Sequence, residues 1–218
     1  MADRDPDLHR RPEHDGGSLD AVDLGGDPVA ALRSWLAVAE DAAIRDFNAM
    51  ALATVDSSGH PTARNVLLRG IDDTGRLEFF TNRRSRKGSD IAGQSAVAVL
   101  FSWLSLDRQI RVDGTAEPTS DERSDAYFAQ RPRDSRIAAW ASEQSSVIAD
   151  RAALDAAVAA VTSRFEGTEV PRPPHWGGYE ITPRSFEFWQ SRPGRLHDRI
   201  RFRRGTAADP WVVERLAP

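Results

Sequence analysis

Residues 49–81 read AMALATVDSSGHPTARNVLLRGIDDTGRLEFFT, and this stretch decides the fold class. The apolar run Ala49–Val55 ends at Asp56-Ser57-Ser58-Gly59, a composition typical of a turn. Thr62–Arg69 predicts a second strand, which ends near another turn at residues 72–75, and Leu77–Thr81 predicts a third. Three short strands in succession place this part of the chain in the β class.

Further strands and helices are expected on both sides of this stretch. Ala96–Trp103 is a nearly continuous apolar run, typical of a buried strand, and Gln109–Val112 alternates polar and apolar residues. Closing strands are expected at residues 178–190, 195–203 and 211–216. Helices are expected at residues 28–42, where Asp27-Pro28 forms an N-cap followed by proline, and at residues 85–91, 120–130, 134–142 and 150–165. The chain is therefore predicted to be mainly β with helices (α+β), as a small barrel with helical additions.

The composition suits one domain preceded by a short arm. Of the 218 residues, 40% are hydrophobic, which is enough for one sizeable core over residues 27–218. Residues 1–26 are rich in Asp, Arg, Gly and His and show no apolar period. We therefore expect a flexible N-terminal arm there.

Charge, hydropathy and motifs exclude several classes of protein. The net charge is −4, without the basic excess that nucleic-acid binding usually shows. No apolar run approaches the roughly 18 residues of a membrane helix, and the N-terminus lacks the apolar core of a signal peptide, so a cytoplasmic protein is expected. Cysteine is absent, which excludes disulfides, thiol catalysis and cysteine-based metal sites. The five histidines show no H-x-x-x-H spacing, so no metal site is predicted, and nucleotide-binding and G-x-S-x-G motifs are missing.

The octapeptide TNRRSRKG, residues 81–88, leaves a predicted strand and enters a predicted helix. Helix N-termini present free N–H groups and the positive end of the helix dipole, so they bind phosphate well. Arg86 and Lys87 would add two cations, and Lys87 is the one lysine among 29 Lys plus Arg residues. A cation about 4 Å from a phosphate charge gains roughly 4 kcal/mol at an effective dielectric near 20. The alternative is a solvated basic turn.

Two other segments could bind an anion. Arg64 and Arg69 flank the apolar residues NVLL, and residues five apart on a strand point to opposite faces. One site could therefore use one of these arginines, or both if the strand bends, while the alternative is a strand with charged ends. Tyr127, Arg131 and Ser135 lie around a proline that forces a helix boundary, which gives either a second anion site or a helix–helix corner held by Arg–Asp pairs.

The segment from Glu187 to Arg199 carries the densest set of polar groups. Arg195, His197 and Arg199 alternate along a predicted strand, so they are expected to share one face. A buried surface of this kind is costly without anionic ligands, and Trp189 could pack against a planar ligand. The alternative is an edge strand with solvated charges.

Taken together, these segments resemble the pyridoxine/pyridoxamine 5′-phosphate oxidases of the FMN-binding split-barrel superfamily. The matching stretches are RNVLLR, FFTNRRSRKG, DRQIRVDGTAE, YFAQRPRDSRIAAWASEQSSVI, VPRPPHWGGY, EFWQ, RLHDRIRFRRG and ERLAP. They stand in the family's order and cover roughly residues 47 to 218. The resemblance implies a split β-barrel with peripheral helices and a homodimer with FMN at the subunit interface. It also implies the oxidation of pyridoxine or pyridoxamine 5′-phosphate at C4′ by O₂, which yields pyridoxal 5′-phosphate and hydrogen peroxide.

The resemblance further implies site residues. It assigns the flavin phosphate to Arg64, Arg86 and Lys87 with Thr81, in agreement with the helix-terminus argument. The implied FMN residues are Arg64, Asn65, Val66, Leu67, Leu68, Arg69, Phe80, Thr81, Arg86, Lys87, Gln109, Gln144, Ser145, Trp189 and Arg199. The implied substrate residues are Arg69, Tyr127, Arg131 and Ser135 at the phosphate, with Arg195, Leu196 and His197 at the pyridine ring. Of these, Arg195 and His197 are the implied catalytic residues.

The sequence departs from the family's pattern in two places. Arg69 stands where a lysine is common, and arginine still binds phosphate, through two hydrogen bonds and without titrating. Family members often carry an arginine and a tyrosine in the arm that fold over the substrate, whereas the tyrosines here are Tyr127 and Tyr179. In the arm, residues Arg10, Arg11 and His14 are candidates to replace them, and none is assigned.

Two other functions stay open. A phenazine-pathway-type flavin oxidase of the same superfamily would keep the FMN residues and lose the substrate-phosphate set. The presence of Tyr127, Arg131 and Ser135 favours the phosphorylated vitamin instead. A non-catalytic flavin or pyridoxal-phosphate binding module would take up its ligand without turnover.

Overall fold

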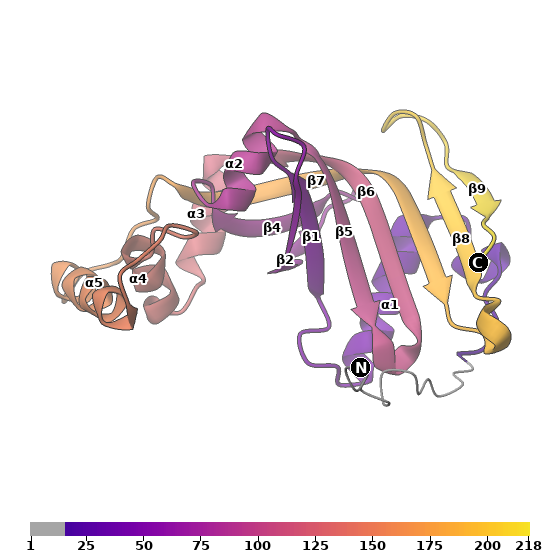
Figure 1. The fold of residues 1–218 in the computed structure, drawn as a ribbon, viewed down its shortest axis with the longest axis horizontal. Coiled ribbons are helices and arrows are strands. Elements are labelled where there is room, and N and C mark those ends of the chain that lie inside the picture. The colour runs from indigo at the N-terminus through magenta and orange to yellow at the C-terminus, as the bar shows by residue number, and fades with distance from the viewer. Residues whose placement is uncertain (1–15) are drawn as a thin grey trace, which may run out of the picture. The chain divides into compact units, whose positions relative to one another are not determined.

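The computed structural model describes residues 16–218, and the chain forms two compact units. Among the described residues, unit 1 comprises residues 16–47, Leu100–Val112 and Ser185–Pro218, and unit 2 comprises Asn48–Val99 and Asp113–Arg184. Three strands contribute residues to both units: β5 (Ala96–Trp103), β6 (Arg108–Pro118) and β7 (Trp176–Gln190) (Figure 1). Three strands run through both units, so the division into units does not decide whether residues 27–218 are a single domain. The single domain predicted over these residues remains a prediction.

The strands form one sheet with the order β2-β1-β5-β6-β7-β4-β3, and β8 pairs with β7 and β9. The remaining strands are β1 (Ala49–Val55), β2 (Pro61–Leu67), β3 (Gly70–Ile71), β4 (Leu77–Asn82), β8 (Asp198–Arg203) and β9 (Val212–Arg215). The pairs β1–β2, β3–β4, β4–β7, β7–β8 and β8–β9 are antiparallel. The turn between β1 and β2 forms as predicted, because the Asp56 side chain accepts hydrogen bonds from the backbone N–H groups of Ser58 and His60.

The predicted helices are confirmed, with small differences at their ends. They are α1 (Pro28–Asp41), α2 (Arg86–Gly93), α3 (Asp121–Ala129), α4 (Arg133–Ala141) and α5 (Arg151–Arg164). The side chains of Asp27, Ser85, Ser120 and Asp150 cap α1, α2, α3 and α5 by accepting a backbone N–H of the first turn. These local hydrogen bonds explain why the sequence located the helix starts well.

The structure corrects three boundaries. The strand predicted over residues 195–203 begins only at Asp198, because Pro193–Arg195 forms a short 3-10 turn in which Gly194 and Arg195 both have positive φ. Strand β6 continues to Pro118, beyond the predicted end at residue 112. A 3-10 helix at Ala21–Leu24 lies within the predicted arm, with Leu24 buried. The arm residues Arg10, Arg11 and His14 lie outside the described residues.

Each unit has its own apolar core. In unit 1, Trp35 of α1 packs edge-on against Phe188 of β7, with ring centroids 5.2 Å apart. In unit 2, Phe79 and Tyr179 stack across β4 and β7 at 5.5 Å. Helices α4 and α5 of unit 2 lie side by side (Figure 1) around a small cluster that includes Phe165. No helix within residues 16–218 is long and apolar enough to span a membrane.

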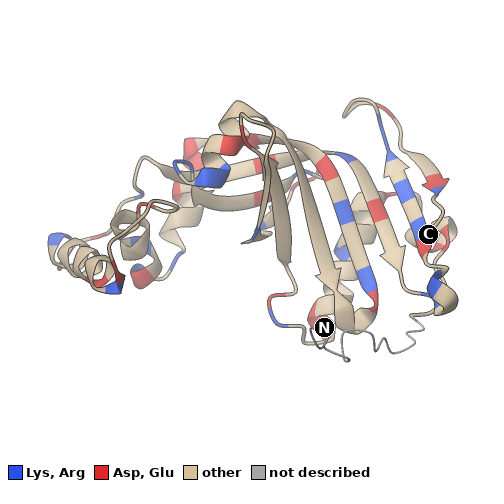
Figure 2. Ribbon diagram, in the orientation of Figure 1, with Lys and Arg blue, Asp and Glu red and all other residues tan. Residues whose placement is uncertain are grey.

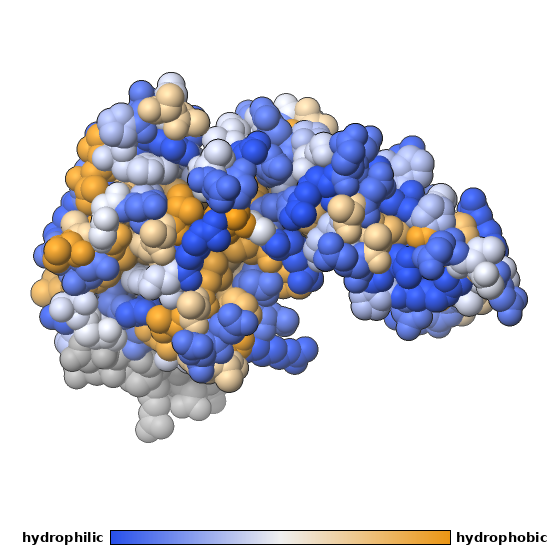
Figure 3. All heavy atoms as spheres, turned by 180° about the vertical axis from the view of Figure 1, so that it is seen from behind, coloured by the Kyte–Doolittle hydropathy of each residue, from blue (hydrophilic) through white to orange (hydrophobic). Residues whose placement is uncertain are grey.

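Apolar side chains also reach the surface. Figure 3 shows them in orange among hydrophilic residues, on the face opposite to the view of Figure 1. Leu104 and Leu196 of unit 1 and Val147 of unit 2 are largely exposed.

Candidate active site

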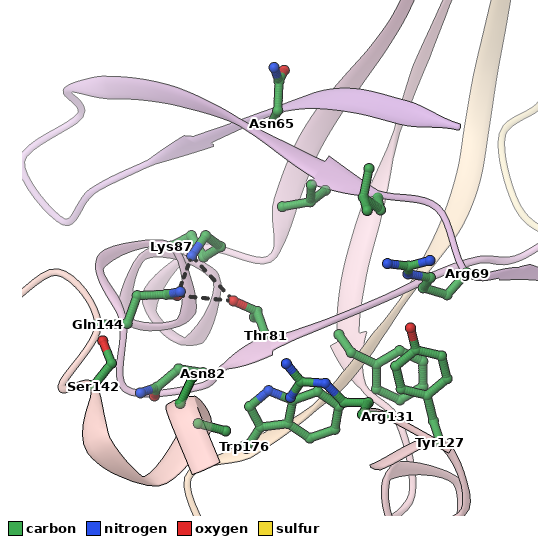
Figure 4. A pocket seen from close by; sticks show the side chains of 15 residues that line it. Asn65, Arg69, Thr81, Asn82, Lys87, Tyr127, Arg131, Ser142, Gln144 and Trp176 are labelled. Atoms are coloured by element: carbon green, nitrogen blue, oxygen red, sulfur yellow. Dashed lines mark hydrogen bonds between the residues drawn. The ribbon is translucent and has the colours of Figure 1, made fainter. Parts of the chain in front are cut away.

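A cavity of about 430 Å³ lies within unit 2. Figure 4 shows Lys87, Thr81 and Gln144 grouped in one part of it, and Arg69, Tyr127 and Arg131 in another. The cavity is lined by Asn65, Val66, Leu67, Arg69, Phe80, Thr81, Asn82, Lys87, Tyr127, Arg131, Ala138, Ala139, Ser142, Gln144 and Trp176. These residues come from segments far apart in the chain, because the tertiary structure gathers β2, β4, α2, α3, α4, β7 and the loops that adjoin them.

Lys87 is a buried cation in the first turn of α2. Its Nζ lies 2.7 Å from Gln144 Oε1 and 3.2 Å from both Thr81 Oγ1 and Ser85 Oγ. None of these partners is a carboxylate. Burial, together with the nearby charge of Arg64, lowers the pKa of Lys87 from 10.5 to about 8. A buried ammonium without an anion beside the free N–H groups of a helix start is a site that favours an anionic ligand.

Gly88 lets this helix start approach the preceding loop. A Cβ at residue 88 would collide with the backbone carbonyl of Arg83. The N-cap Ser85 completes the turn, since its Oγ accepts a hydrogen bond from Gly88 N at 3.5 Å. The pattern Ser-Arg-Lys-Gly therefore places Lys87 in the first turn for local steric and capping reasons.

Arg64 and Arg86 lie close to this group but do not line the cavity. Arg64 donates from Nη1 to Thr54 Oγ1 at 2.7 Å, and its Nη2 lies 3.7 Å from the carboxylate of Asp90. Arg86 forms an ion pair with Asp56 at 2.9 Å. Both arginines therefore have a carboxylate nearby, whereas the partners of Lys87 are neutral oxygens.

Aromatic rings surround the second cation of the cavity, Arg131. Its guanidinium lies over the rings of Trp176 at 4.7 Å and Phe128 at 5.5 Å. Phe80 and Tyr127 stack at 4.0 Å, nearly parallel. Arg131 Nη1 is buried and has no hydrogen-bond partner among the described residues, and burial lowers the pKa of Arg131. A buried N–H donor without an acceptor is costly, so it indicates a missing acceptor such as a phosphate oxygen.

Arg69 is separated from Arg64 by the end of β2. The strand stops at Leu67, and Arg69 N donates to Glu78 O at 2.7 Å. The exposed Arg69 guanidinium lies 5.9 Å from the Tyr127 ring, on the Arg131 side of the cavity. The chain therefore leaves the strand between the two arginines, and only Arg69 lines the cavity.

Other predicted residues of unit 2 lie outside the cavity lining. They are Leu68, which is buried, Ser135, which is partly buried on α4, and Ser145, which is exposed with a φ of +78°. Conversely, sequence reasoning assigned no role to Trp176, although it stands in the matching stretch VPRPPHWGGY. Its signal was an aromatic residue directly before Gly-Gly at a strand start, and only the fold shows that Arg131 packs on it.

The remaining predicted residues lie in unit 1. The rings of Trp189 and His197 are 4.6 Å apart, and His197 Nδ1 accepts the backbone N–H of Arg192 at 3.1 Å. Arg199 donates to Glu187 at 2.7 Å. Gln109 lies partly buried on β6, and Leu196 is largely exposed.

The prediction that Arg195, His197 and Arg199 share one face of a strand is wrong. Arg195 and His197 precede β8, and the positive φ of Arg195 breaks the strand alternation on which the argument depended. The alternation holds from Arg199 onward, where Figure 2 shows basic residues in bands along β8.

Within residues 16–218 there is no group of three His, Asp or Glu side chains that could hold a metal ion.

The cavity is lined by cations and aromatic rings and lies in a sheet with peripheral helices, and known structures share this fold. PhzG from Burkholderia lata, solved with tetrahydrophenazine-1-carboxylic acid, superposes with a TM-score of 0.82 and 33% identity, over 88% of this chain and 93% of that one. A pyridoxamine 5′-phosphate oxidase-related, FMN binding protein from Nostoc punctiforme has a TM-score of 0.68 and 18% identity, over 88% and 98% of the two chains. The fold is therefore a split β-barrel with peripheral helices, which confirms the predicted fold class.

Sequence comparison then defines the family. The pyridoxamine 5′-phosphate oxidase profile matches residues 38–165, and that of the pyridoxine 5′-phosphate oxidase C-terminal dimerisation region matches residues 176–218. A pyridoxine/pyridoxamine 5′-phosphate oxidase from Burkholderia mallei is 51% identical over 209 residues, 95% of this chain and 97% of its own length. A protein of the same name from Burkholderia orbicola matches equally. The chain belongs to the pyridoxamine 5′-phosphate oxidase family.

Proposed function

We propose that this chain oxidises pyridoxine 5′-phosphate or pyridoxamine 5′-phosphate with O₂, with FMN as its cofactor. The alcohol and O₂ give pyridoxal 5′-phosphate and hydrogen peroxide, while the amine also consumes water and releases ammonia. The observation that carries the proposal is one cavity with two anion-seeking cations, Lys87 and Arg131, beside stacked aromatic rings. Such a cavity would hold two planar ligands, each of which carries a phosphate.

The Lys87 group fits the phosphate of FMN. Lys87 has hydroxyl and amide neighbours but no carboxylate, and the free N–H groups of the α2 start lie beside it. In this assignment Lys87 and Thr81 hold the phosphate, with Arg64 and Arg86 as neighbouring cations. When bound, FMN supplies two-electron oxidation and reacts with O₂, and the protein orients the reactants.

The Arg131 group fits the phosphate of the substrate. Arg131 Nη1 offers an unused donor, and the guanidinium carbon lies 4.7 Å from the centroid of the Trp176 ring. Arg69 and Tyr127 would complete this binding group, because both line the same cavity. Ser135 remains part of the proposal, although it does not line the cavity.

The unit 1 residues are proposed to meet the ring systems of the two ligands in a homodimer. Gln109, Trp189 and Arg199 would contact the flavin, with Gln144 and Ser145 of unit 2. Arg195 and His197 would face the substrate ring, where Arg195 positions it. The dimerisation-region match and the exposed apolar side chains of Figure 3 support this assembly.

A phenazine-type flavin oxidase is the second candidate. The 33% identical PhzG, solved with a phenazine-type carboxylic acid, favours it. The buried donor of Arg131 favours a phosphorylated substrate instead, because an aromatic acid without a phosphate has less charge to offer it.

The deciding experiment mixes the purified FMN-loaded protein with pyridoxine 5′-phosphate or pyridoxamine 5′-phosphate in air. We expect pyridoxal 5′-phosphate and hydrogen peroxide in equal amounts, and no turnover of tetrahydrophenazine-1-carboxylic acid. A yellow protein without turnover would indicate a binding module. A protein that takes up neither FMN nor pyridoxal 5′-phosphate would contradict all three functions.

The depressed pKa of Lys87 predicts a pH dependence of FMN affinity. A bound phosphate favours the charged ammonium, whereas the ligand-free lysine loses its proton near pH 8. Affinity should therefore be nearly full at about pH 7 and fall by about tenfold by about pH 9. Fluorescence titration of FMN at each pH measures this, and a Lys87→Met variant should show a flat profile over the same range.

The same group makes a contribution of opposite sense to the stability of the ligand-free protein. Between about pH 8 and the ordinary lysine pKa of 10.5, the unfolded chain holds a proton that the folded chain has released. The contribution of Lys87 to the free energy of unfolding therefore rises with pH in this window. The difference in denaturant midpoint between wild type and Lys87→Met isolates it.

A further inference from the structure

A buried carboxylate, Glu187, lies among the proposed flavin residues of unit 1. It stands two residues before Trp189 on β7, so both side chains project from the same face of the strand. Its side chain is 7% exposed and lies between two arginines. Oε1 is 2.7 Å from Arg199 Nε, and Oε2 is 3.2 Å from Arg111 Nη2.

The two oxygens of Glu187 are not equally satisfied. Oε1 accepts a hydrogen bond from Arg199, while Oε2 is buried and accepts none among the described residues. Arg111 therefore compensates Oε2 by charge rather than by a well-aligned hydrogen bond. Burial of an incompletely paired carboxylate costs stability. We therefore expect the charge of Glu187 to have a role that an apolar side chain could not fill.

Two protein acceptors fix the guanidinium of Arg199. Its Nε donates to Glu187, and its Nη1 donates to Ala217 O at 2.9 Å. The C-terminal segment is itself fastened there, since Leu216 N donates to Arg199 O at 2.9 Å. Two of the three guanidinium nitrogens are therefore paired within the protein, and Nη2 has no partner within the described residues.

We propose that Glu187 is a positioning residue that orients Arg199 toward the flavin, and that the row Arg111–Glu187–Arg199 sets the charge around the bound cofactor. The inference rests on the proposed FMN site. The carboxylate makes the surroundings of Arg199 less positive, and Arg111 opposes it. A more positive environment favours acceptance of electrons, so the two residues shift the reduction potential in opposite directions.

The test measures the reduction potential of the bound flavin by anaerobic titration against a reference dye, and FMN affinity by fluorescence. Glu187→Gln keeps the shape and removes the charge, so we expect a positive shift in potential and about tenfold weaker FMN binding. Arg111→Met should shift the potential in the negative direction. A loss of packing would move both variants the same way, so opposite signs identify the effect of charge.

Glu214→Gln is the matched control. Glu214 also pairs with two arginines of β8, Arg201 and Arg203, so its removal costs a comparable ion-pair set. We expect no change in potential or affinity. Should Glu187→Gln fail to fold, Arg111→Met is compared with the Glu214→Gln control, because the Arg111 side chain is 46% exposed: a negative shift in Arg111→Met alone supports the proposal, and no shift or a positive one overturns it.

Equal potentials in wild type and both site variants, or shifts of the same sign, would overturn the role of Glu187. Wild-type protein that takes up no FMN would overturn the proposed function and this inference with it. The two failures are thus separated by the wild-type titration, before any variant is compared.

Discussion

Replacing Lys87 by methionine should weaken FMN binding about 100-fold without destabilising the ligand-free protein. The ammonium is buried, its pKa is lowered to about 8, and its neighbours are neutral oxygens. Loss of a charge-assisted contact to a phosphate costs about 1.5–3 kcal/mol, and every 1.4 kcal/mol is about tenfold in affinity. Methionine fills a similar volume without the desolvation cost, so the melting temperature should stay equal or rise.

Arg84→Met is the matched control for this prediction. Arg84 lies in the same basic turn, but its side chain is exposed and does not line the cavity. Arg84→Met removes one positive charge from the turn, as Lys87→Met does. Because Arg84 is exposed and outside the cavity, FMN affinity should change by about twofold or less. Equal losses in the two variants would mean that the turn attracts FMN by bulk charge, against a specific role of Lys87.

Replacing Arg131 by methionine should lower kcat/KM for pyridoxine 5′-phosphate by about 100- to 1,000-fold. A guanidinium that binds a phosphate through two charged hydrogen bonds contributes about 3–4 kcal/mol. The free Nη1 and the lowered pKa of Arg131 show that the protein itself leaves the group under-paired. Methionine would keep the contact with Trp176, so the fold and the melting temperature should be preserved.

Substrate charge separates this effect from general damage. Unphosphorylated pyridoxine cannot use Arg131, so its slow oxidation should be the same in wild type and Arg131→Met. Arg131→Lys should recover only part of the activity, because a lysine lacks the flat fork that stacks on Trp176. An equal loss with pyridoxine would assign Arg131 to the fold or to flavin binding.

Local chemistry made much of the fold predictable. The helix starts at Asp27 and Ser85 follow from side-chain caps a few residues away, and the turn at Asp56 follows from its own hydrogen bonds. The strand at Ala96–Trp103 was predicted with its observed bounds, since an apolar run of that length needs burial. Such features involve neighbours in the chain, so the sequence contains what is needed to find them.

The site was predictable where it depended on residues close together in the chain. The motif Ser85-Arg86-Lys87-Gly88 indicated a phosphate-binding helix start, and the structure places Lys87 there in the cavity wall. The pattern failed at Arg195, because Pro193 and Gly194 form a turn that interrupts the alternation expected of a strand. Side chains alternate between two faces only for residues that lie within a strand.

The sequence by itself determined the class of elements, their starts and the basic turn at Lys87. Only the tertiary structure decided that Arg131 packs on Trp176, that Arg69 lies apart from Arg64, and that Glu187 is buried between two arginines. Burial and missing partners are properties of groups far apart in the chain. Whether a charged side chain is solvated or left needing a ligand therefore depends on what the fold brings beside it.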